Sequence, residues 1–439
     1  MTVHSLLLSL LNDIEANKKY VNLAINSHLL DNLLYDERRT VTAALYTTVE
    51  HRLTLDYFIG AISGRSTDDI DPTVLNILRL GACEIIYMDS VPDYAAVNEC
   101  VSLGKGKGER SFINAVLRSI ARAKAENALP MPKKEKNPQR YLSIKYSFPL
   151  WICKTFYSLY GEEGAEALLD KFNKMQYTDI VVNATKTTKG EYRIMLGEAG
   201  FEALDSEYSH LTLRIPYSVN PTRLPHFEDG YFFVQDTACT ASAIALGAQS
   251  GERVVDVCAC PGGKSFATSI LMGGVGDILS LDLHESKLSL ITDGAKRLSL
   301  DNITVRQCDA TSPIEDELMR FDRVICDVPC SGLGVLGKKA DMRYSRTQTD
   351  VDELPTLQAE ILEKSAGYLK VGGSMIYSTC TLNPRENEGV VNTFLAHHDD
   401  FVLEPFELEN GEKCQGMFTF IPHIHDTDGF FIAKLKKTH

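Results

Sequence analysis

Two cysteines stand where predicted strands end. Cys330 follows a strand predicted over 321–327, and Cys380 follows one predicted over 374–378. Because the carboxyl ends of parallel strands meet at one edge of a sheet, we expect the two thiols to share a crevice there. Turn residues flank both cysteines, and loops of this kind often carry catalytic groups. A thiol in such a crevice can act as a nucleophile once it is ionised.

This pair of thiols suits methylation of a pyrimidine ring. Carbon-5 of cytosine is a poor nucleophile until a thiolate adds to carbon-6, after which carbon-5 can attack a sulfonium methyl group. A free thiol has a pKa near ~8.5, so the attacking cysteine needs a positive dipole such as a helix start. A base must then remove the carbon-5 proton so that the thiol can leave. Asp327 is placed to hold the polar edge of the cytosine. The spacing leaves open which cysteine attacks.

The other cysteines predict no further chemistry. We interpret Cys83, Cys153 and Cys326 as small buried apolar residues. Cys258 and Cys260 are too close in sequence for the usual metal pair, and we expect no metal. Eleven cysteines without the spacing of a small disulfide scaffold indicate free thiols in a reducing compartment, which predicts a cytoplasmic protein.

A glycine-rich turn follows the predicted strand that ends near Asp256. Paired glycines let the backbone approach a ligand closely, and the following helix offers unpaired amide donors. About twenty residues later the next strand ends at Asp282, whose carboxylate can accept hydrogen bonds from ribose hydroxyls. Asp309, after the third strand, would reach an adenine edge. We therefore expect S-adenosylmethionine as the cofactor. The expected binding residues are Cys258, Ala259, Cys260, Pro261, Gly262, Gly263, Lys264, Asp282, Asp309 and Asp327.

A glycine-rich turn alone also occurs in ordinary strand-to-helix connections. The glycine spacing here differs from that of dinucleotide-binding sites, and residues 262–265 resemble a phosphate-binding loop only superficially. Acidic residues that close three successive strands favour the adenosyl site.

The chain after residue 231 alternates apolar strands with amphipathic helices. This alternation predicts right-handed βαβ units, a doubly wound parallel sheet and a Rossmann-like α/β domain that binds ligands beyond its strand ends. The expected strands are 254–257, 278–281, 303–305, 324–325 and 375–377.

The first half of the chain has a different pattern. Helical periodicity from residue 3 to about 125 predicts an all-helical first domain. Prolines and lysines over 129–140 indicate a linker, and residues 141–174 are again helical. Short β-like runs predict a small α+β segment. These runs are 180–182, 192–195 and 211–215.

The net charge of -14 argues against nonspecific binding to nucleic acid, because phosphate contacts need a positive surface. Local basic clusters can still bind RNA, or they can be solvated surface charges. The candidates are Lys105, Lys107, Arg110, Arg118, Arg122 and Lys124; then Lys133, Lys134, Lys136 and Arg140; and then Lys338, Lys339, Arg343 and Arg346. No apolar run approaches the length that crosses a membrane.

These motifs closely resemble those of the cytosine carbon-5 RNA methyltransferases, and especially the RsmB branch, also called Sun or Fmu. The catalytic half matches in the loop from Cys258 to Lys264 and in the runs Val234-Gln235-Asp236, Asp327-Val328-Pro329-Cys330-Ser331-Gly332, Ser378-Thr379-Cys380, Glu386-Asn387-Glu388 and Asp428-Gly429-Phe430-Phe431-Ile432-Ala433. The first domain resembles NusB-type RNA-binding domains through Ala95-Ala96-Val97-Asn98-Glu99 and Phe112-Ile113-Asn114-Ala115-Val116-Leu117-Arg118.

The resemblance implies a function and a domain plan. It implies methylation of cytosine carbon-5 in 16S ribosomal RNA, with Cys380 as the nucleophile and Cys330 assisting product release. The expected domains are a NusB-like RNA-binding domain over 1–128, a linker over 129–140, a small helical and α+β RNA-binding segment over 141–230, and the methyltransferase domain over 231–439. We expect a monomer without an obligate protein partner, acting on 16S RNA that is unassembled or in an early assembly intermediate.

Other functions stay open on the sequence. The chain could be a noncatalytic RNA-binding or transcription-related protein, but the intact Asp256, Asp282, Asp327, Cys330 and Cys380 argue against this alternative. It could also methylate another RNA, such as transfer RNA, or a protein. Protein methylation would not require two cysteines in the crevice.

Overall fold

The computed structural model describes residues 2–17, 21–25, 35–174, 177–339 and 341–439, and these form two compact units. The helical unit comprises Met1–Asn173 and Lys338–Arg346, and the α/β unit comprises Lys174–Gly337 and Thr347–His439. No helix in the described ranges has both the length and the apolar character needed to cross a membrane.

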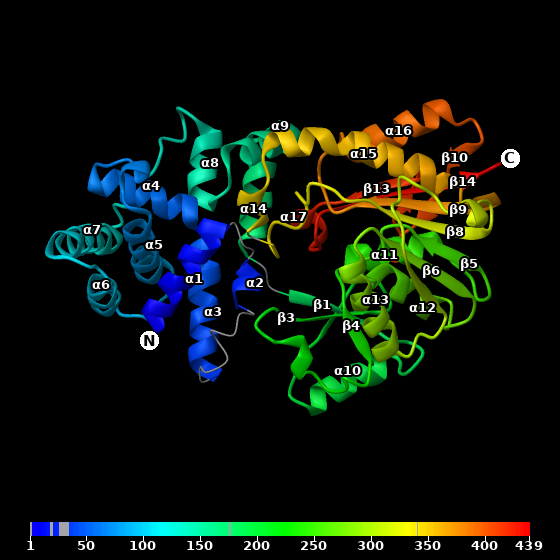
Figure 1. Ribbon diagram of the computed structural model, residues 1–439, viewed down its shortest axis with the longest axis horizontal. Helices are drawn as coiled ribbons and strands as arrows, with labels where there is room; N and C mark the ends of the chain where they lie inside the picture. The colour runs from blue at the N-terminus through cyan, green and yellow to red at the C-terminus, as the bar shows by residue number, and fades with distance from the viewer. Residues whose placement is uncertain (1, 18–20, 26–34, 175–176, 340) are drawn as a thin grey trace. The chain divides into compact units, whose positions relative to one another are not determined.

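The helical unit packs around one central helix, α5. Its helices are α1 (Val3–Asn17), α2 (Val21–Ile25), α3 (Tyr35–Glu50), α4 (Arg52–Ser63), α5 (Pro72–Tyr87), α6 (Asp93–Ser102), α7 (Lys107–Ala125), α8 (Pro138–Tyr146), α9 (Leu150–Phe172) and α14 (Met342–Ser345) (Figure 1). Asp71 caps the start of α5 by accepting hydrogen bonds from the backbone N–H groups of Thr73 and Val74. Because α5 is apolar on nearly every side, it is buried among α1, α3, α4, α6 and α7. The predicted helical first domain is confirmed for the described residues.

Helices α8 and α9 also belong to the helical unit. The Thr54 hydroxyl donates to the Ile144 carbonyl at 2.5 Å, and the Leu53 N–H donates to the Ser147 hydroxyl at 3.0 Å. These contacts join α8 and α9 to the first helices within one compact unit.

A short segment from the second half of the chain completes the helical unit. Within it, Arg343 is 0% exposed, its Nη2 lies 3.2 Å from Glu50 Oε1, and its guanidinium lies 3.9 Å from the centre of the Phe148 ring. The Tyr344 hydroxyl donates to the Glu50 carbonyl at 2.9 Å. The prediction that Arg343 belongs to a basic surface cluster is wrong, because the carboxylate and the aromatic ring compensate its burial.

The α/β unit begins with a small antiparallel sheet in the order β2-β3-β1-β4. Its elements are β1 (Tyr177–Val182), α10 (Lys189–Glu198), β2 (Leu204–Asp205), β3 (Thr212–Pro216) and β4 (Phe232–Val234). The strand predicted over 192–195 is wrong, because these residues lie in α10. Thr188 and Glu191 form a capping box there, and Tyr192 and Leu196 are buried one turn apart.

The large sheet has the order β10-β14-β9-β8-β5-β6-β7, with β13 paired to β14. Its strands are β5 (Arg253–Asp256), β6 (Asp277–Asp282), β7 (Ile303–Gln307), β8 (Phe321–Asp327), β9 (Leu369–Thr379), β10 (Phe401–Leu403), β13 (Met417–Phe420) and β14 (Phe430–Lys437); β11 (Phe406–Glu407) and β12 (Lys413–Cys414) pair with each other. Strands β5 to β9 are parallel, whereas β10, β13 and β14 are antiparallel to their neighbours. The predicted parallel sheet is found in β5 to β9, and β14 joins it as an antiparallel strand because a short connection from β13 reverses the chain.

Helices cover both faces of the large sheet (Figure 1). They are α11 (Thr237–Leu246), α12 (Gly263–Leu271), α13 (Glu285–Leu298), α15 (Gln348–Ala366) and α16 (Glu388–His397), while α17 (Pro422–His425) lies in the connection from β13 to β14. Val255 packs in one core with α15 and α16, and its neighbour Val254 packs in another with α11, because successive strand residues face opposite sides. The chain places β6 and then β7 on one side of β5, and it then returns to place β8 on the other side of β5. The loops after β5 and β8 therefore flank a topological switch point, where α/β sheets bind ligands.

Candidate active site

The predicted glycine loop joins β5 to α12 at this switch point. Gly262 has φ of +110°, and a Cβ there would lie 2.4 Å from Phe266 Cζ. A Cβ on Gly263 would lie 2.6 Å from Gln235 Nε2. Gly262 provides no side-chain cap, so the first amide groups of α12 stay available to an acceptor. The loop thus fits the adenosyl ligand that its sequence predicts.

Asp282, at the end of β6, holds this loop in place. Its Oδ2 accepts a hydrogen bond from the Cys260 N–H at 3.1 Å, and its Oδ1 accepts one from the His284 N–H at 3.1 Å. Each carboxylate oxygen can accept a second hydrogen bond. Asp282 can therefore fix the loop and also accept a ribose hydroxyl.

Asp309 lies exposed beyond β7. Its Oδ1 accepts hydrogen bonds from the Thr311 N–H at 2.9 Å and the Thr311 hydroxyl at 2.8 Å. The backbone hydrogen bond from Thr311 lowers the pKa of Asp309. A charged acceptor therefore stands at the strand end where the adenine was expected.

Buried Lys264 forms an ion pair with half-buried Asp327, and the sequence did not predict this pair. The Lys264 Nζ donates to Asp327 Oδ2 at 2.6 Å, and the Ser378 hydroxyl donates to Asp327 Oδ1 at 2.7 Å. Burial lowers the pKa of Lys264, but the charge of Asp327, its hydrogen bond to Lys264 and the charges of Cys239 and Asp256 together outweigh burial, so the pKa is raised and the ammonium group stays charged. The pair connects the glycine loop to the end of β8.

The two cysteines meet at the carboxyl ends of β8 and β9. Their Sγ atoms lie 3.0 Å apart although 50 positions separate them in the sequence. The Cys380 N–H donates to the Cys330 sulfur at 3.2 Å. The hydrogen bond with Cys380, followed by burial, raises the pKa of Cys330 well above its usual range. Cys330 therefore stays a protonated thiol at neutral pH.

A buried carboxylate, Glu386, organises the loop that carries Cys330. Glu386 is 0% exposed. It accepts hydrogen bonds from the Ser331 N–H at 2.8 Å and the Ser331 hydroxyl at 2.6 Å. The Gln358 side chain on α15 donates to Glu386 Oε2 and to the Pro329 carbonyl, both at 3.0 Å. Glu386 and Gln358 thus fix the residues on either side of Cys330.

The same carboxylate reaches the loop that carries Cys380. The Asn383 amide donates to Glu386 Oε1 at 3.0 Å, and the Thr381 hydroxyl lies 2.7 Å from the Ser331 hydroxyl. The Gly334 N–H donates to the Cys380 carbonyl at 2.9 Å. We had noted Glu386 only as part of a family motif. Its position in a polar loop, two residues before α16 begins, gave no signal that it links two strands.

The remaining predicted cofactor residues contribute mainly backbone. The Ala259 side chain is buried, and the Ala259 N–H donates to the Leu281 carbonyl at 2.8 Å. Cys258 packs against the core that residues of α15 and α16 help to form, and burial raises the pKa of Cys258 well above the usual range. Pro261 follows Cys260 through a cis peptide bond. The roles of these residues stay predictions.

Three family models match the chain. The description "16S rRNA methyltransferase RsmB/F" matches residues 243–436, "NusB family" matches residues 1–122, and "Methyltr_RsmF/B-like, ferredoxin-like domain" matches residues 148–220.

Similar proteins cover nearly the whole chain. "Probable ribosomal RNA small subunit methyltransferase B" of Synechocystis sp. is 35% identical, covering 98% of each chain, and the protein of the same name from Bacillus subtilis is 33% identical, covering 99% of each. The solved structure titled "Crystal Structure of PH0851" has a TM-score of 0.79 and 25% identity, and covers 100% of this chain and 99% of its own. A "Methyltransferase Homolog Protein from Pyrococcus Horikoshii" has a TM-score of 0.60 and 26% identity, over 69% of this chain and 99% of its own. The chain therefore belongs to the RsmB/Sun family of 16S ribosomal RNA methyltransferases, whose methyl donor is S-adenosylmethionine.

Proposed function

We propose that this protein methylates carbon-5 of a specific cytosine in 16S ribosomal RNA through a covalent bond between Cys380 and carbon-6. The observation that carries the proposal is the pair of thiols whose sulfurs lie 3.0 Å apart. Methyl transfer to oxygen, to an exocyclic nitrogen or to protein needs no such pair, whereas attack at carbon-6 requires one thiolate and a neighbouring acid or base.

In the proposed reaction, the Cys380 thiolate adds to carbon-6, and the electron pair of the carbon-5 to carbon-6 bond moves toward carbon-5. S-adenosylmethionine supplies an electrophilic methyl group, which carbon-5 takes while the sulfonium sulfur keeps the bonding electrons. A solvent base then takes the carbon-5 proton, the electron pair of the broken C–H bond restores the double bond, and the carbon-6 to sulfur bond breaks so that Cys380 leaves as a thiolate. Asp327 holds the polar edge of the cytosine.

Cys330 assists this last step. Its raised pKa favours a neutral thiol beside Cys380, which the resemblance to the cytosine carbon-5 RNA methyltransferases identifies as the nucleophile. A neutral Cys330 can donate a hydrogen bond to the departing Cys380 sulfur and so make it a better leaving group.

The cofactor residues follow from the same arrangement. We propose that Asp282 accepts the ribose hydroxyls, that Asp309 meets the adenine, and that residues 258–264 surround the methionine part with backbone groups. Lys264 acts by fixing Asp327, which lies 2.6 Å from its ammonium group.

The remaining proposals concern the substrate and the domains. We propose that the NusB-like region over 1–128 and the segment over 141–230 bind RNA, with 129–140 as the linker and 231–439 as the methyltransferase domain. The protein would act in the cytoplasm as a monomer, without an obligate protein partner, on 16S RNA that is unassembled or in an early assembly intermediate.

The test is incubation of the purified protein with methyl-labelled S-adenosylmethionine and unmethylated 16S RNA, followed by nucleoside analysis. We expect the label in 5-methylcytidine, absent with Cys380→Ala and retained with the control Cys414→Ala, which removes a thiol from β12. Cys330→Ala should accumulate a covalent protein-RNA adduct on a denaturing gel. An adduct that forms with Cys380→Ala instead would reverse the two roles.

Other outcomes separate the alternatives. Label only in transfer RNA would keep the chemistry and change the substrate. Label in another nucleoside would refute carbon-5 transfer. No label in ribosomal RNA, transfer RNA or protein would favour a noncatalytic RNA-binding protein.

A further inference from the structure

Each of the three basic clusters in the sequence has one member that is engaged within the helical unit. Arg343 is buried against Glu50 and Phe148. Lys134 lies 3.1 Å from carboxylate oxygens of both Glu162 and Glu166. In the cluster over 105–124, Lys124 lies 3.7 Å from Asp93, and the other cations include a regular series on one helix.

This third cluster follows one stripe of α7. Depressions of about 370 and 420 Å³ open between α6 and α7, and α7 lines them with Lys107, Arg110, Asn114, Arg118 and Arg122. These residues recur at three- and four-residue intervals, so they share one face of the helix. At 1.5 Å per residue the stripe is about 22 Å long. We call it the α7 basic stripe.

The cations of the α7 basic stripe are accessible. Arg110, Arg118 and Arg122 are exposed. Arg118 donates from Nε to Asn114 Oδ1 at 2.8 Å, and within the described part of the chain neither Arg118 nor Arg122 forms an ion pair. Most of their N–H donors therefore remain for a ligand.

The nearby carboxylates are engaged. Asp93 Oδ1 lies 3.7 Å from Lys124 Nζ, and Glu109 Oε2 accepts the Lys105 N–H at 2.8 Å. Glu99 Oε2 lies 3.9 Å from His4 Nδ1. The whole protein is negatively charged, with 59 acidic and 45 basic residues, whereas this stripe is locally positive. A locally positive surface favours the binding of a polyanion.

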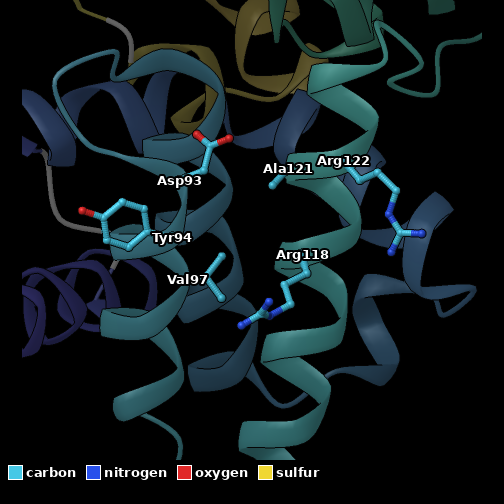
Figure 2. A pocket seen from close by; sticks show the side chains of 6 residues that line it. All are labelled: Asp93, Tyr94, Val97, Arg118, Ala121 and Arg122. Carbon is cyan, nitrogen blue, oxygen red and sulfur yellow. The ribbon is translucent and has the colours of Figure 1, made fainter.

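An exposed aromatic ring stands beside the stripe. Tyr94 on α6 is 73% exposed and lines the same depression as Arg118. Figure 2 shows Arg118 extending from α7 toward Val97, with Tyr94 on the same helix as Val97. A cation for phosphate and a ring for base stacking are the two elements with which proteins bind single-stranded nucleic acid.

We propose that the α7 basic stripe and Tyr94 bind a single-stranded segment of RNA, with phosphates against the arginines and a base on the Tyr94 ring. This inference deepens the proposed function, because it names where the helical unit would contact the RNA. An acidic polypeptide could form ion pairs with the arginines, but it has no base to stack on the exposed Tyr94 ring.

The experiment measures binding of the full chain to a fluorescent single-stranded oligoribonucleotide by anisotropy at several salt concentrations. Arg118→Ala with Arg122→Ala should weaken binding about tenfold and reduce the log-log salt slope by about 1.4, or about 0.7 for each lost phosphate contact. The matched control, Arg38→Ala with Arg39→Ala on α3, removes two exposed charges outside the stripe.

A second variant tests the ring. Tyr94→Ala should weaken binding about tenfold without changing the salt slope, and Tyr94→Phe should retain binding because it keeps the stacking surface. Equal binding by the Arg118/Arg122 and Arg38/Arg39 variants would overturn the proposal. Displacement of the RNA by polyglutamate as readily as by an unlabelled polynucleotide would indicate an acidic polypeptide ligand and would overturn it as well.

The assay uses no methyl donor, so it is independent of the reaction. Loss of methyl transfer with normal RNA binding would count against the proposed function alone. Loss of the predicted binding differences with normal methyl transfer would count against the α7 basic stripe alone.

Discussion

The catalytic region of the α/β unit and the α7 basic stripe of the helical unit handle charge in opposite ways. In the catalytic region, Lys264 is buried against Asp327, and Glu386 is buried among hydrogen-bond donors. On the stripe, Arg118 and Arg122 are exposed. The difference fits the roles that we propose for the two regions. Bond formation requires atoms fixed within a fraction of an ångström, whereas attraction of a phosphate backbone requires only accessible charge.

This comparison predicts that single changes in the catalytic region have large effects and that changes on the surface have small, salt-dependent ones. The largest effect should come from Cys380→Ala. Loss of the attacking sulfur should reduce kcat by at least about a thousandfold, with the affinity for S-adenosylmethionine unchanged. Single-turnover kinetics and calorimetric titration of the cofactor would measure the two quantities. Residual methylation at a tenth of the normal rate would contradict the assignment of Cys380.

The buried carboxylate of Asp256 should make stability depend on pH. Burial raises the pKa of Asp256 from 3.8 to about 7. Between these values the unfolded chain has lost a proton that the folded protein keeps, so the free energy of unfolding falls as the pH rises through about 4 to 7. Asp256→Asn should abolish this pH dependence of the free energy of unfolding.

Urea denaturation of both proteins across this pH range would measure the effect. We expect the stability of the normal protein relative to Asp256→Asn to decrease by roughly 2 to 4 kcal/mol from pH 4 to pH 7. Parallel curves for the two proteins would show that Asp256 ionises in the fold as it does in the unfolded chain.

Loss of the Glu386 side chain should displace both cysteine loops. Glu386→Ala leaves the Ser331 and Asn383 donors without their acceptor, and we expect kcat to fall about a hundredfold, the cost of a displacement near 1 Å. Binding of RNA to the α7 basic stripe should not change. The control is Glu363→Ala, an exposed carboxylate on α15 that pairs with His398. Recovery of part of the rate by Glu386→Gln would support a positioning role.

A smaller effect should come from Asp282→Ala. The substitution removes the carboxylate that accepts a hydrogen bond from the Cys260 N–H and, in our proposal, from a ribose hydroxyl. We expect S-adenosylmethionine binding to weaken about tenfold. Calorimetric titration would measure this change, while the affinity for RNA serves as the internal control. Unchanged cofactor affinity would remove Asp282 from the ribose site.

The smallest effect should come from Lys134→Ala, which removes a cation already paired with Glu162 and Glu166. We expect less than about a twofold change in RNA affinity, because a paired charge contributes little to the local potential. The same anisotropy titration would test this expectation. An effect as large as that of the Arg118/Arg122 variant would show that both clusters bind RNA.

The sequence predicted the periodic elements of this protein well. The helices of the first domain and the strands before Asp256, Asp282 and Asp327 follow directly from apolar spacing. It failed at residues 192–195, where a short apolar run was read as a strand although a capping box starts a helix nearby. It did not show that β14 is antiparallel to β9, because apolar spacing within a strand carries no information on the direction of its neighbour.

The charge pattern was less informative than the apolar pattern. Arg343, Lys134 and Arg118 stand in similar basic runs, yet the fold buries the first, pairs the second and exposes the third. The partners of the first two, Glu50 and Glu166, are distant in sequence, so no local pattern distinguishes the three clusters.

By itself the sequence determined which residue types stand at the strand ends: two cysteines, a glycine loop and acidic residues. Only the tertiary structure decided that the Cys330 and Cys380 sulfurs lie 3.0 Å apart and that Glu386 joins their loops. The physical reason is that pairing between β8 and β9 sets the distance between residues 50 positions apart, and a side chain reveals its partners only when such strands are in register.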